Sequence, residues 1–426
     1  MRILIVTQYF WPELFRINDL ARGLVEAGHE VTVLTGMPNY PAGRLFPGYG
    51  YFHPNQEDHG GVAVRRVPLV PRGSSGRWRL PANYLSFALS ATLLGPWRSR
   101  GRFDVIFAFQ PSPVTVALPA LLLRRLKGTP LLLWVLDLWP ESLSATGAVS
   151  SPLVLSAVSH MVRFIYRRCD RVLVSSRAFI PSVLSLSASP DKVVYFPNWA
   201  ESVYGPADVE AGAPERSELP EGFRVMFGGN IGAAQSFETM LDAATRLKGS
   251  DIQWVVLGDG RRRGWLEERI HVLGLESCVH VLGPRPMEAM PRYFALADAL
   301  LISLKRDPAF ARTIPAKLQS YLACARPIVA ALDGEAARIV EEAAAGVTCA
   351  AEDGAALAEA VRSLRDMSPE QRASMGARGR AYHQEHFDRQ TLIEGLERIM
   401  RAAREERECA SSGAGETLTS KPGPAE

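Results

Sequence analysis

The sequence predicts an α/β protein built of two doubly wound, Rossmann-like domains, each a parallel sheet with helices on both faces. Its 426 residues are enough for two complete hydrophobic cores. Apolar runs of strand length alternate with helical patterns in both halves, which indicates parallel strands buried on both faces. The alternation stops once, between residues 201 and 222, where Pro, Gly, Ala, Glu and Ser replace the periodic pattern.

The first domain is expected at residues 1–200. The run "RILIVTQYF" begins it as a strand, a helix follows at residues 18–27, and Gly28 ends that helix before the strand "HEVTVLTG". Four further apolar runs have the length and β-branched content of strands: "FDVIFAFQP", "PLLLWVLDLWP", "DRVLVSS" and "KVVYFPN". Residues 201–222 are then predicted to form an interdomain linker.

The second domain is expected at residues 223–385. Its strands are read from the runs "FRVMFGGN", "DIQWVVLGDG", "CVHVLG", "ADALLISL" and "RPIVAAL". A helix at residues 386–403 is expected to pack back toward the first domain. The tail, residues 404–426, is charged and then rich in Ser, Gly and Pro, so we predict that it is disordered.

Composition argues against several classes of protein. A formal net charge of +3 is too small to indicate nucleic-acid binding. The five cysteines and eight histidines are dispersed without metal-ligand spacing, so we expect neither a disulfide framework nor a metal, and no cofactor. The opening "MRILIVTQYFWP" fits a buried strand better than an export signal, which predicts a cytoplasmic protein.

The most apolar segment is "NYLSFALSATLLGPW" at residues 83–97, which is too short to span a bilayer. Arginines flank it on both sides: Arg77, Arg79, Arg98, Arg100 and Arg102. Two interpretations stay open, a helix of the core or an interfacial helix on lipid headgroups. In the second case the contact residues would be Leu85, Phe87, Leu89, Leu93, Leu94 and Trp97.

A glycine turn between a strand and a helix suggests an anion site in "FGGNIGAAQSFETMLDAATRL". Gly229 and Gly232 would leave backbone N–H groups accessible, and the start of the helix adds partial positive charge. Such turns also occur without a ligand, and no Lys or Arg lies between Gly228 and Thr245. The turn "LGDG", with Gly258, is a weaker signal of the same kind.

The missing positive charge can come from a second loop, "FARTIPAKLQSYLACARPI". Pro315 suits the start of a helix, and Lys317 then falls in the first turn, where the helix dipole disfavours a cation unless an anion is present. Arg312, Lys305 and Arg285 come from neighbouring loops and could converge there. Solvated surface charges are the alternative interpretation for each of them.

In the first domain, "VLDLWPES" places Asp137 and Glu141 at the carboxyl end of an apolar strand, where ligands bind in α/β folds. Either carboxylate could instead cap a helix. The proline- and aromatic-rich loop "GMPNYPAGRLFPGYG" is typical of lids and substrate contacts.

As a set, several motifs make the chain resemble retaining glycosyltransferases of family 4, which have the GT-B fold of two facing Rossmann-like domains. The resemblance covers residues 1–400 and is strongest to bacterial surface-polysaccharide enzymes of the L-fucosamine transferase and colanic-acid type. The motifs are "TQYFWPE", "GHEVTVLTGMPNYPAG", "LDLWPES", "FPNWAE", "FGGNIGAAQSFE" and "TIPAKLQSYLACARPI".

The resemblance implies metal-independent transfer, with retention, from a nucleotide-sugar to a lipid-linked glycan in surface-polysaccharide biosynthesis. The donor would bind the second domain and be UDP-linked, such as UDP-N-acetyl-L-fucosamine. The acceptor would be polyprenyl-diphosphate-linked and bind the first domain, placing the protein peripherally on the inner face of the plasma membrane. A sugar-nucleotide epimerase of the same fold and a non-catalytic scaffold are the alternatives.

The site residues expected from these motifs fall into three groups. Catalysis is assigned to Asp137, Glu141 and Lys317. Donor binding is assigned to Gly229, Asn230, Gly232, Gln235, Gly258, Arg285, Arg312, Pro315, Lys317, Gln319 and Ser320. Acceptor binding is assigned to Trp11, Asn39, Tyr40 and Trp139.

The chain departs from the family pattern at its charged positions. Many members have an Arg in the glycine turn and a Lys about six residues later, where this chain has Asn230 and Gln235 or Ser236. Many also have a Glu-x7-Glu pair whose second Glu would align near Ser320.

Overall fold

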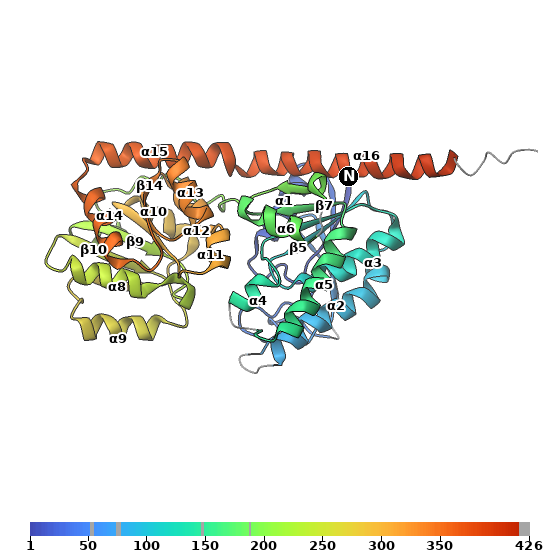
Figure 1. Ribbon diagram of the computed structural model, residues 1–426, viewed down its shortest axis with the longest axis horizontal. Helices are drawn as coiled ribbons and strands as arrows, with labels where there is room; N and C mark the ends of the chain where they lie inside the picture. Colours follow the sequence, from blue (N-terminus) through green and yellow to red (C-terminus); the bar gives the residue numbers. More distant parts are fainter. Residues whose placement is uncertain (52–54, 74–77, 146–148, 187–188, 417–426) are drawn as a thin grey trace, which may run out of the picture. The chain divides into compact units, whose positions relative to one another are not determined.

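The computed structural model describes residues 1–51, 55–73, 78–145, 149–186 and 189–416. It divides into two compact units (Figure 1). Unit 1 comprises residues 1–175, 179–196 and the described residues from 390 onward, and unit 2 comprises residues 176–178 and 197–389. Both are α/β units with parallel sheets, as expected.

Unit 1 contains an eight-stranded sheet in the order β3-β4-β2-β1-β5-β6-β7-β8. Its strands are β1 (Arg2–Val6), β2 (Glu30–Gly36), β3 (Gln56–His59), β4 (Val62–Val67), β5 (Val105–Gln110), β6 (Leu131–Val135), β7 (Arg171–Val174) and β8 (Val193–Tyr195). All neighbours are parallel except β3, which pairs antiparallel with β4. The central strands are buried throughout, which explains their uninterrupted apolar sequences.

The helices of unit 1 are α1 (Arg16–Glu26), α2 (Arg79–Arg98), α3 (Ala117–Lys127), α4 (Glu141–Ala145), α5 (Pro152–Arg168), α6 (Ile180–Ser185) and most of α16 (Arg389–Glu416). Single-turn 3-10 helices lie at Val114–Val116, Arg177–Phe179 and Pro190–Lys192. Helix α1 buries Ile17, Leu20 and Leu24 at helical spacing, and Gly28 follows it with a positive φ of 83°.

Unit 2 contains a six-stranded parallel sheet in the order β11-β10-β9-β12-β13-β14. The strands are β9 (Phe223–Gly228), β10 (Ile252–Leu257), β11 (Val279–Gly283), β12 (Ala299–Ser303), β13 (Ile328–Ala331) and β14 (Gly346–Cys349). Numbered within the unit, this is the 3-2-1-4-5-6 order of dinucleotide-binding folds. The order reverses between β9 and β12, so ligands are expected at the carboxyl ends of those strands.

The helices of unit 2 are α7 (Pro214–Ser217), α8 (Phe237–Arg246), α9 (Arg263–Leu273), α10 (Met290–Ala295), α11 (Pro308–Arg312), α12 (Ala316–Ala323), α13 (Glu335–Glu342), α14 (Gly354–Asp366) and α15 (Pro369–His386), with 3-10 turns at Ala233–Gln235 and Met287–Ala289. They cover both faces of the sheet. Val225 and Phe227 point into the core formed with α8 and α14, whereas Met226, between them, points into the core formed with α10, α12 and α13.

Residues 201–222 are not a free linker, because they belong to unit 2 and are bound to it by side-chain contacts. Glu215, in α7, forms an ion pair with Arg292 at 2.6 Å. Glu218 accepts hydrogen bonds from the Arg285 guanidinium and the Tyr293 hydroxyl, both at 2.7 Å. Composition alone could not reveal these partners, since they lie about 75 residues away in the sequence.

The prediction of disorder from residue 404 is wrong for residues 404–416, which continue α16 to Glu416 (Figure 1). The helix packs on unit 1 through the buried Met400 and Ala403. Arg404 pairs with Asp104 at 3.3 Å, and Arg407 lies 3.6 Å from Asp170. These tertiary contacts, rather than apolar content, order the charged segment.

The apolar segment at residues 83–97 lies within α2, which packs against α3, β2 and β4. Phe87 is fully buried, so its expected lipid contact is wrong, whereas Leu85, Leu89, Leu93 and Trp97 are exposed. Arg77 lies outside the described residues. In the described ranges, no helix combines the length and apolar character needed to cross a membrane.

Candidate active site

Unit 2 contains a cavity of about 600 Å³ at the carboxyl ends of β9, β10 and β11. The end of β9 is one of the two strand ends at which the strand order predicts a ligand. The cavity is lined by Glu201, Tyr204, Gly228, Gly229, Gln235, Leu257, Gly258, Asp259, Pro284, Arg285, Met287, Met290, Phe294, Pro315, Ala316, Lys317, Ser320 and Tyr321.

Two glycines let the ends of β9 and β10 approach each other closely. A Cβ atom on Gly258 would lie 1.8 Å from the carbonyl oxygen of Gly229, a distance that no side chain tolerates. Gly229 has a φ of 129°, a conformation that favours glycine. The buried Tyr321 hydroxyl accepts the N–H of Gly228 at 2.8 Å and so fixes the start of the turn. The N–H of Gly229 donates to the carbonyl of Leu257 at 2.9 Å, so the turn is a rigid backbone cradle whose first two N–H groups are already hydrogen-bonded.

Lys317 reaches this cradle from the start of α12. Its Nζ donates a hydrogen bond to Oε1 of Gln235 at 2.6 Å and lies 3.7 Å from the centre of the Phe227 ring. The same Nζ is 3.9 Å from the position of a Cβ on Gly229. Burial lowers the pKa of Lys317 to about 7 from its ordinary value of 10.5. A ligand with negative charge would favour the protonated ammonium.

The structure places the remaining predicted donor residues in three different ways. Gln235, Gly258, Arg285, Pro315 and Ser320 line the cavity together with Gly229 and Lys317. Asn230, Gly232 and Arg312 are not among the lining residues. Gln319 is fully buried on the core side of α12, beside the carbonyls of Pro315 and Ala316, so its predicted donor contact is wrong. Successive helical residues point in different directions, and the burial of Leu318 and Tyr321 orients this helix.

The two cationic lining residues are not equivalent. Arg285 donates to the Glu218 carboxylate at 2.7 Å and to the Tyr293 hydroxyl at 3.0 Å. These contacts already neutralise its charge. Within the part of the chain that the structure describes, the Lys317 ammonium donates to the neutral Gln235 amide and to no carboxylate, so its charge is available to a ligand. Gln235, which stands where many family members have a Lys, thus supplies no charge itself but orients the Lys317 ammonium.

Sequence reasoning missed several lining residues, among them Glu201, Tyr204, Tyr321 and Phe294. Tyr321 could have been inferred, because a tyrosine at an inward helical position needs a buried partner for its hydroxyl. Glu201 and Tyr204 carried no such signal, since they lie in the segment expected to be a linker. Tyr204 stacks on Phe294, with ring centres 6.2 Å apart.

In unit 1, Asp137 follows the carboxyl end of β6 as expected. Its Oδ2 accepts the indole N–H of Trp139 at 3.1 Å, and its backbone carbonyl accepts from Gln110 at 2.9 Å. Burial raises the pKa of Asp137 to about 6, although hydrogen bonds from Ser142, Trp139 and Ser112 oppose the rise. Glu141 begins the short helix α4 and adds a repulsive charge. Trp139 is itself buried, so the expectation that it stacks on an acceptor sugar is wrong.

The loops after β1 and β2 expose Trp11 and Tyr40, each with 38% of its surface accessible. Asn39, predicted beside them as an acceptor contact, is instead fully buried. Its side-chain Oδ1 accepts the backbone N–H of Arg72, and its side-chain Nδ2 donates to the backbone carbonyl of Met37 at 3.0 Å. Its role is to join loops, because a buried amide must satisfy its hydrogen bonds internally.

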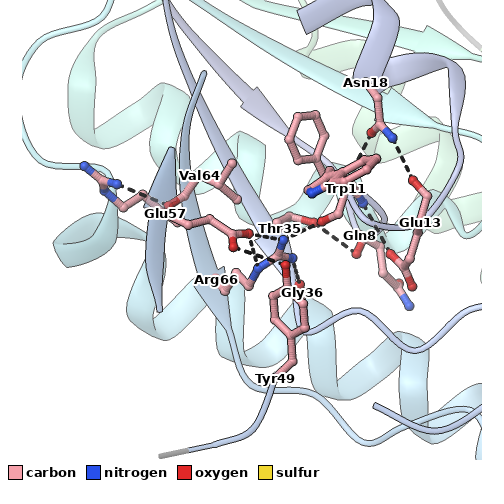
Figure 2. Close-up of polar contacts among 12 residues, drawn as sticks. Gln8, Trp11, Glu13, Asn18, Thr35, Gly36, Tyr49, Glu57, Val64 and Arg66 are labelled. Atoms are coloured by element: carbon pink, nitrogen blue, oxygen red, sulfur yellow. Dashed lines mark hydrogen bonds and ion pairs between the residues drawn. The ribbon is translucent and has the colours of Figure 1, made fainter. Parts of the chain in front are cut away.

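Two buried ionisable side chains, Glu13 and Arg66, hold these loops in place (Figure 2). Oε1 of Glu13 accepts the N–H groups of Asn39 and Tyr40, both at 2.8 Å, and burial raises the pKa of Glu13 to about 7. The buried Arg66 guanidinium donates to the carbonyl of Gly36 at 2.9 Å, to the carbonyl of Trp11 and to the Glu57 carboxylate. The exposed rings are therefore anchored from beneath by groups that the sequence did not single out.

Metal ligands are not gathered anywhere in the described ranges: no group of three or more His, Cys, Asp or Glu side chains could hold an ion there.

The chain matches two family models, the "Glycosyl transferase 4-like domain" at residues 15–199 and "Glycosyl transferases group 1" at residues 222–366. A protein of Escherichia coli K12 named as a colanic acid biosynthesis glycosyl transferase, WcaI, is 28% identical over 336 residues, or 76% of this chain and 81% of its own length. A protein of Pseudomonas aeruginosa named as a glycosyltransferase, WbjE, is 26% identical over 70% of this chain and 74% of its own.

The fold is that of solved glycosyltransferase structures. Anabaena Alr3699/HepE, solved in complex with UDP, superposes with a TM-score of 0.67 at 14% identity, covering 94% of this chain and 100% of that one. Both halves of the chain match glycosyltransferase models, and each is a doubly wound α/β unit of the kind that these structures contain. The chain belongs to the glycosyltransferases of the GT-B fold.

Proposed function

We propose that this glycosyltransferase transfers a sugar from a UDP-linked donor to a lipid-linked glycan during synthesis of a surface polysaccharide. The observation that carries the proposal is the cavity of unit 2, where Lys317 reaches a rigid glycine cradle of the size and polarity that a sugar diphosphate needs. The similarity to WcaI, named for colanic acid biosynthesis, supports a role in polysaccharide synthesis, and the UDP bound by the Anabaena structure supports a UDP-linked donor.

The proposed chemistry follows from where charge develops. As the sugar–phosphate bond breaks, negative charge builds on the leaving diphosphate, so donors fixed beforehand lower the barrier. The backbone N–H groups of Gly228 and Gly229 already donate to the Tyr321 hydroxyl and the Leu257 carbonyl, so in unit 2 these donors are the N–H groups of the Lys317 ammonium. We propose that they act without a metal ion and that transfer proceeds with retention. Asp137 is the proposed group that orients the acceptor hydroxyl or stabilises the oxocarbenium-like state.

Binding is tested by calorimetry with UDP-, GDP- and dTDP-sugars, including UDP-N-acetyl-L-fucosamine, which the resemblance favours. NMR of the donor incubated with protein and a polyprenyl-diphosphate glycan then identifies the reaction. Transfer with a retained anomeric configuration supports the proposal. Isomerisation of the donor would indicate an epimerase, and an unchanged donor would indicate a non-catalytic scaffold.

The lipid-linked acceptor requires contact with a membrane, and we propose α2 as the contact surface on the inner leaflet. Leu85, Leu89, Leu93 and Trp97 recur every four residues along one exposed face. On the opposite side α2 is packed against the sheet. A helix that is apolar on two sides normally has a partner on both.

A further inference from the structure

Unit 1 has a second cavity, of about 530 Å³, at the end of α2. It is lined by Thr32, Gln56, Arg65, Leu94, Trp97, Arg98, Ser99 and Arg100. These residues come from β2, the first residue of β3, β4 and the carboxyl end of α2. The cavity therefore belongs to unit 1 alone and is separate from the donor cavity of unit 2.

The charge of this cavity is of one sign. Three arginines line it and no acidic residue does. Neither Arg65, Arg98 nor Arg100 forms an ion pair with any residue in the described ranges. Glu30, two residues before Thr32 on β2, is paired with Arg2 at 3.1 Å. Three guanidinium groups in one concavity without counter-ions favour an anionic ligand, and their planar donor geometry suits phosphate oxygens.

The cavity adjoins the apolar face of α2. Trp97 lines the cavity and also ends the exposed series Leu85, Leu89, Leu93 and Trp97, which are 62, 62, 57 and 66% exposed. The series extends about 18 Å along the helix at 1.5 Å per residue. Trp78, just before α2, is 78% exposed at the opposite end. Tryptophans at both ends of an apolar series match the preference of the indole ring for the headgroup level.

We propose that this arginine cavity binds the phosphate of an anionic membrane lipid when the apolar face of α2 lies in the bilayer interface. This inference rests on the membrane contact proposed above and adds a specific headgroup site to it. With the leucines at the level of the upper acyl chains, the arginines beside Trp97 would lie at the level of the phosphates. The site would hold the enzyme on anionic membranes and restrict the orientations of α2.

The test measures binding of the full chain to two kinds of vesicle, phosphatidylcholine alone and phosphatidylcholine mixed with phosphatidylglycerol. We expect tighter binding to the mixed vesicles. Replacing Arg98→Gln and Arg100→Gln together should weaken that binding roughly 30-fold, since each basic residue near the surface contributes about 1 kcal/mol, or about fivefold. Binding to phosphatidylcholine alone should change little.

A matched control removes two exposed arginines of unit 1 outside the cavity, Arg44→Gln with Arg125→Gln. If the cavity is a site, the control loses about threefold or less. Equal losses in the two double variants would overturn the proposal, because they would show a diffuse attraction of total charge. Equal binding of the wild-type protein to the two kinds of vesicle would also overturn it, since the cavity would then not recognise an anionic headgroup.

The variant Leu89→Asp separates this inference from the membrane contact on which it rests. Leu89 is exposed, so the substitution should leave the melting temperature and donor binding unchanged and abolish binding to both kinds of vesicle. Unchanged vesicle binding would refute the contact through α2, and the headgroup site with it. If the wild-type protein is a dimer that Leu89→Asp converts to a monomer, a second copy covers the apolar face and the lipid proposal fails.

Discussion

Donor affinity should fall as pH rises above 7, because the cation that meets the diphosphate is half-buried and easily deprotonated. Burial lowers the pKa of Lys317 to about 7 in the free protein. Below this pH the ammonium is already present, and binding of UDP or a UDP-sugar needs no further proton. Above it the free protein holds a neutral amine, so binding the diphosphate must take up a proton.

The magnitude follows from proton linkage. For each pH unit above 7, restoring the ammonium costs about 1.4 kcal/mol, so affinity should fall up to tenfold per unit until the pKa of the bound state is reached. Between pH 7 and about pH 9 the loss should approach 100-fold, or about 2.7 kcal/mol. The folding equilibrium of the free protein depends on pH in the opposite direction. Lys317 has a pKa of 10.5 in the unfolded chain, which therefore binds more protons than the folded protein, so Lys317 makes the free energy of unfolding rise between about pH 7 and 10.5.

Calorimetry in buffers of different ionisation enthalpy measures both the affinity and the protons taken up. The wild-type protein should bind close to one additional proton per UDP above pH 7. The control Lys317→Met should bind UDP roughly 10- to 100-fold more weakly at neutral pH, as expected for loss of a charge-assisted hydrogen bond, and should show no proton uptake. A flat wild-type affinity from neutral to alkaline pH, or an equal decline in Lys317→Met, would refute the assignment.

Three further predictions concern other parts of the molecule. Asp137→Asn should lower turnover about 100-fold or more with nearly unchanged donor affinity and melting temperature. If turnover is normal and the free energy of unfolding falls by about 1 kcal/mol or less, Asp137 is only a helix cap and Glu141 becomes the candidate catalytic carboxylate. Gly258→Ala should abolish UDP binding in calorimetry, since its Cβ would overlap the carbonyl of the glycine turn, whereas Gly264→Ala, with open space around it, should bind normally; equal affinity of both variants would contradict the rigid cradle. The raised pKa of Glu13 means that the folded state binds more protons between pH 4.5 and about 7, so stability should decrease as pH rises through this range. Glu13→Gln should flatten the corresponding curve of melting temperature against pH, and an unaltered curve would argue against a protonated Glu13.

The sequence by itself determined the two α/β units, because strand and helix periods are local properties. Buried parallel strands must be apolar throughout, as in β5 and β6, and glycines must stand where a chain turns or where backbones touch, as at Gly28 and Gly258. It also indicated that Lys317 at a helix start implies an anion, since the helix dipole opposes a cation there.

Only the tertiary structure decided which side chains lie together. Asn39 and Trp139 seemed suited to a substrate, yet packing buries both, and Gln319 lies one helical position from a cavity residue but points into the core. Arg404 and Arg407 of α16 pair with Asp104 and Asp170, which are distant in sequence. Burial and long-range pairing depend on all elements at once, and for this reason the partners of Lys317 and the cavity beside α2 emerged only from the folded chain.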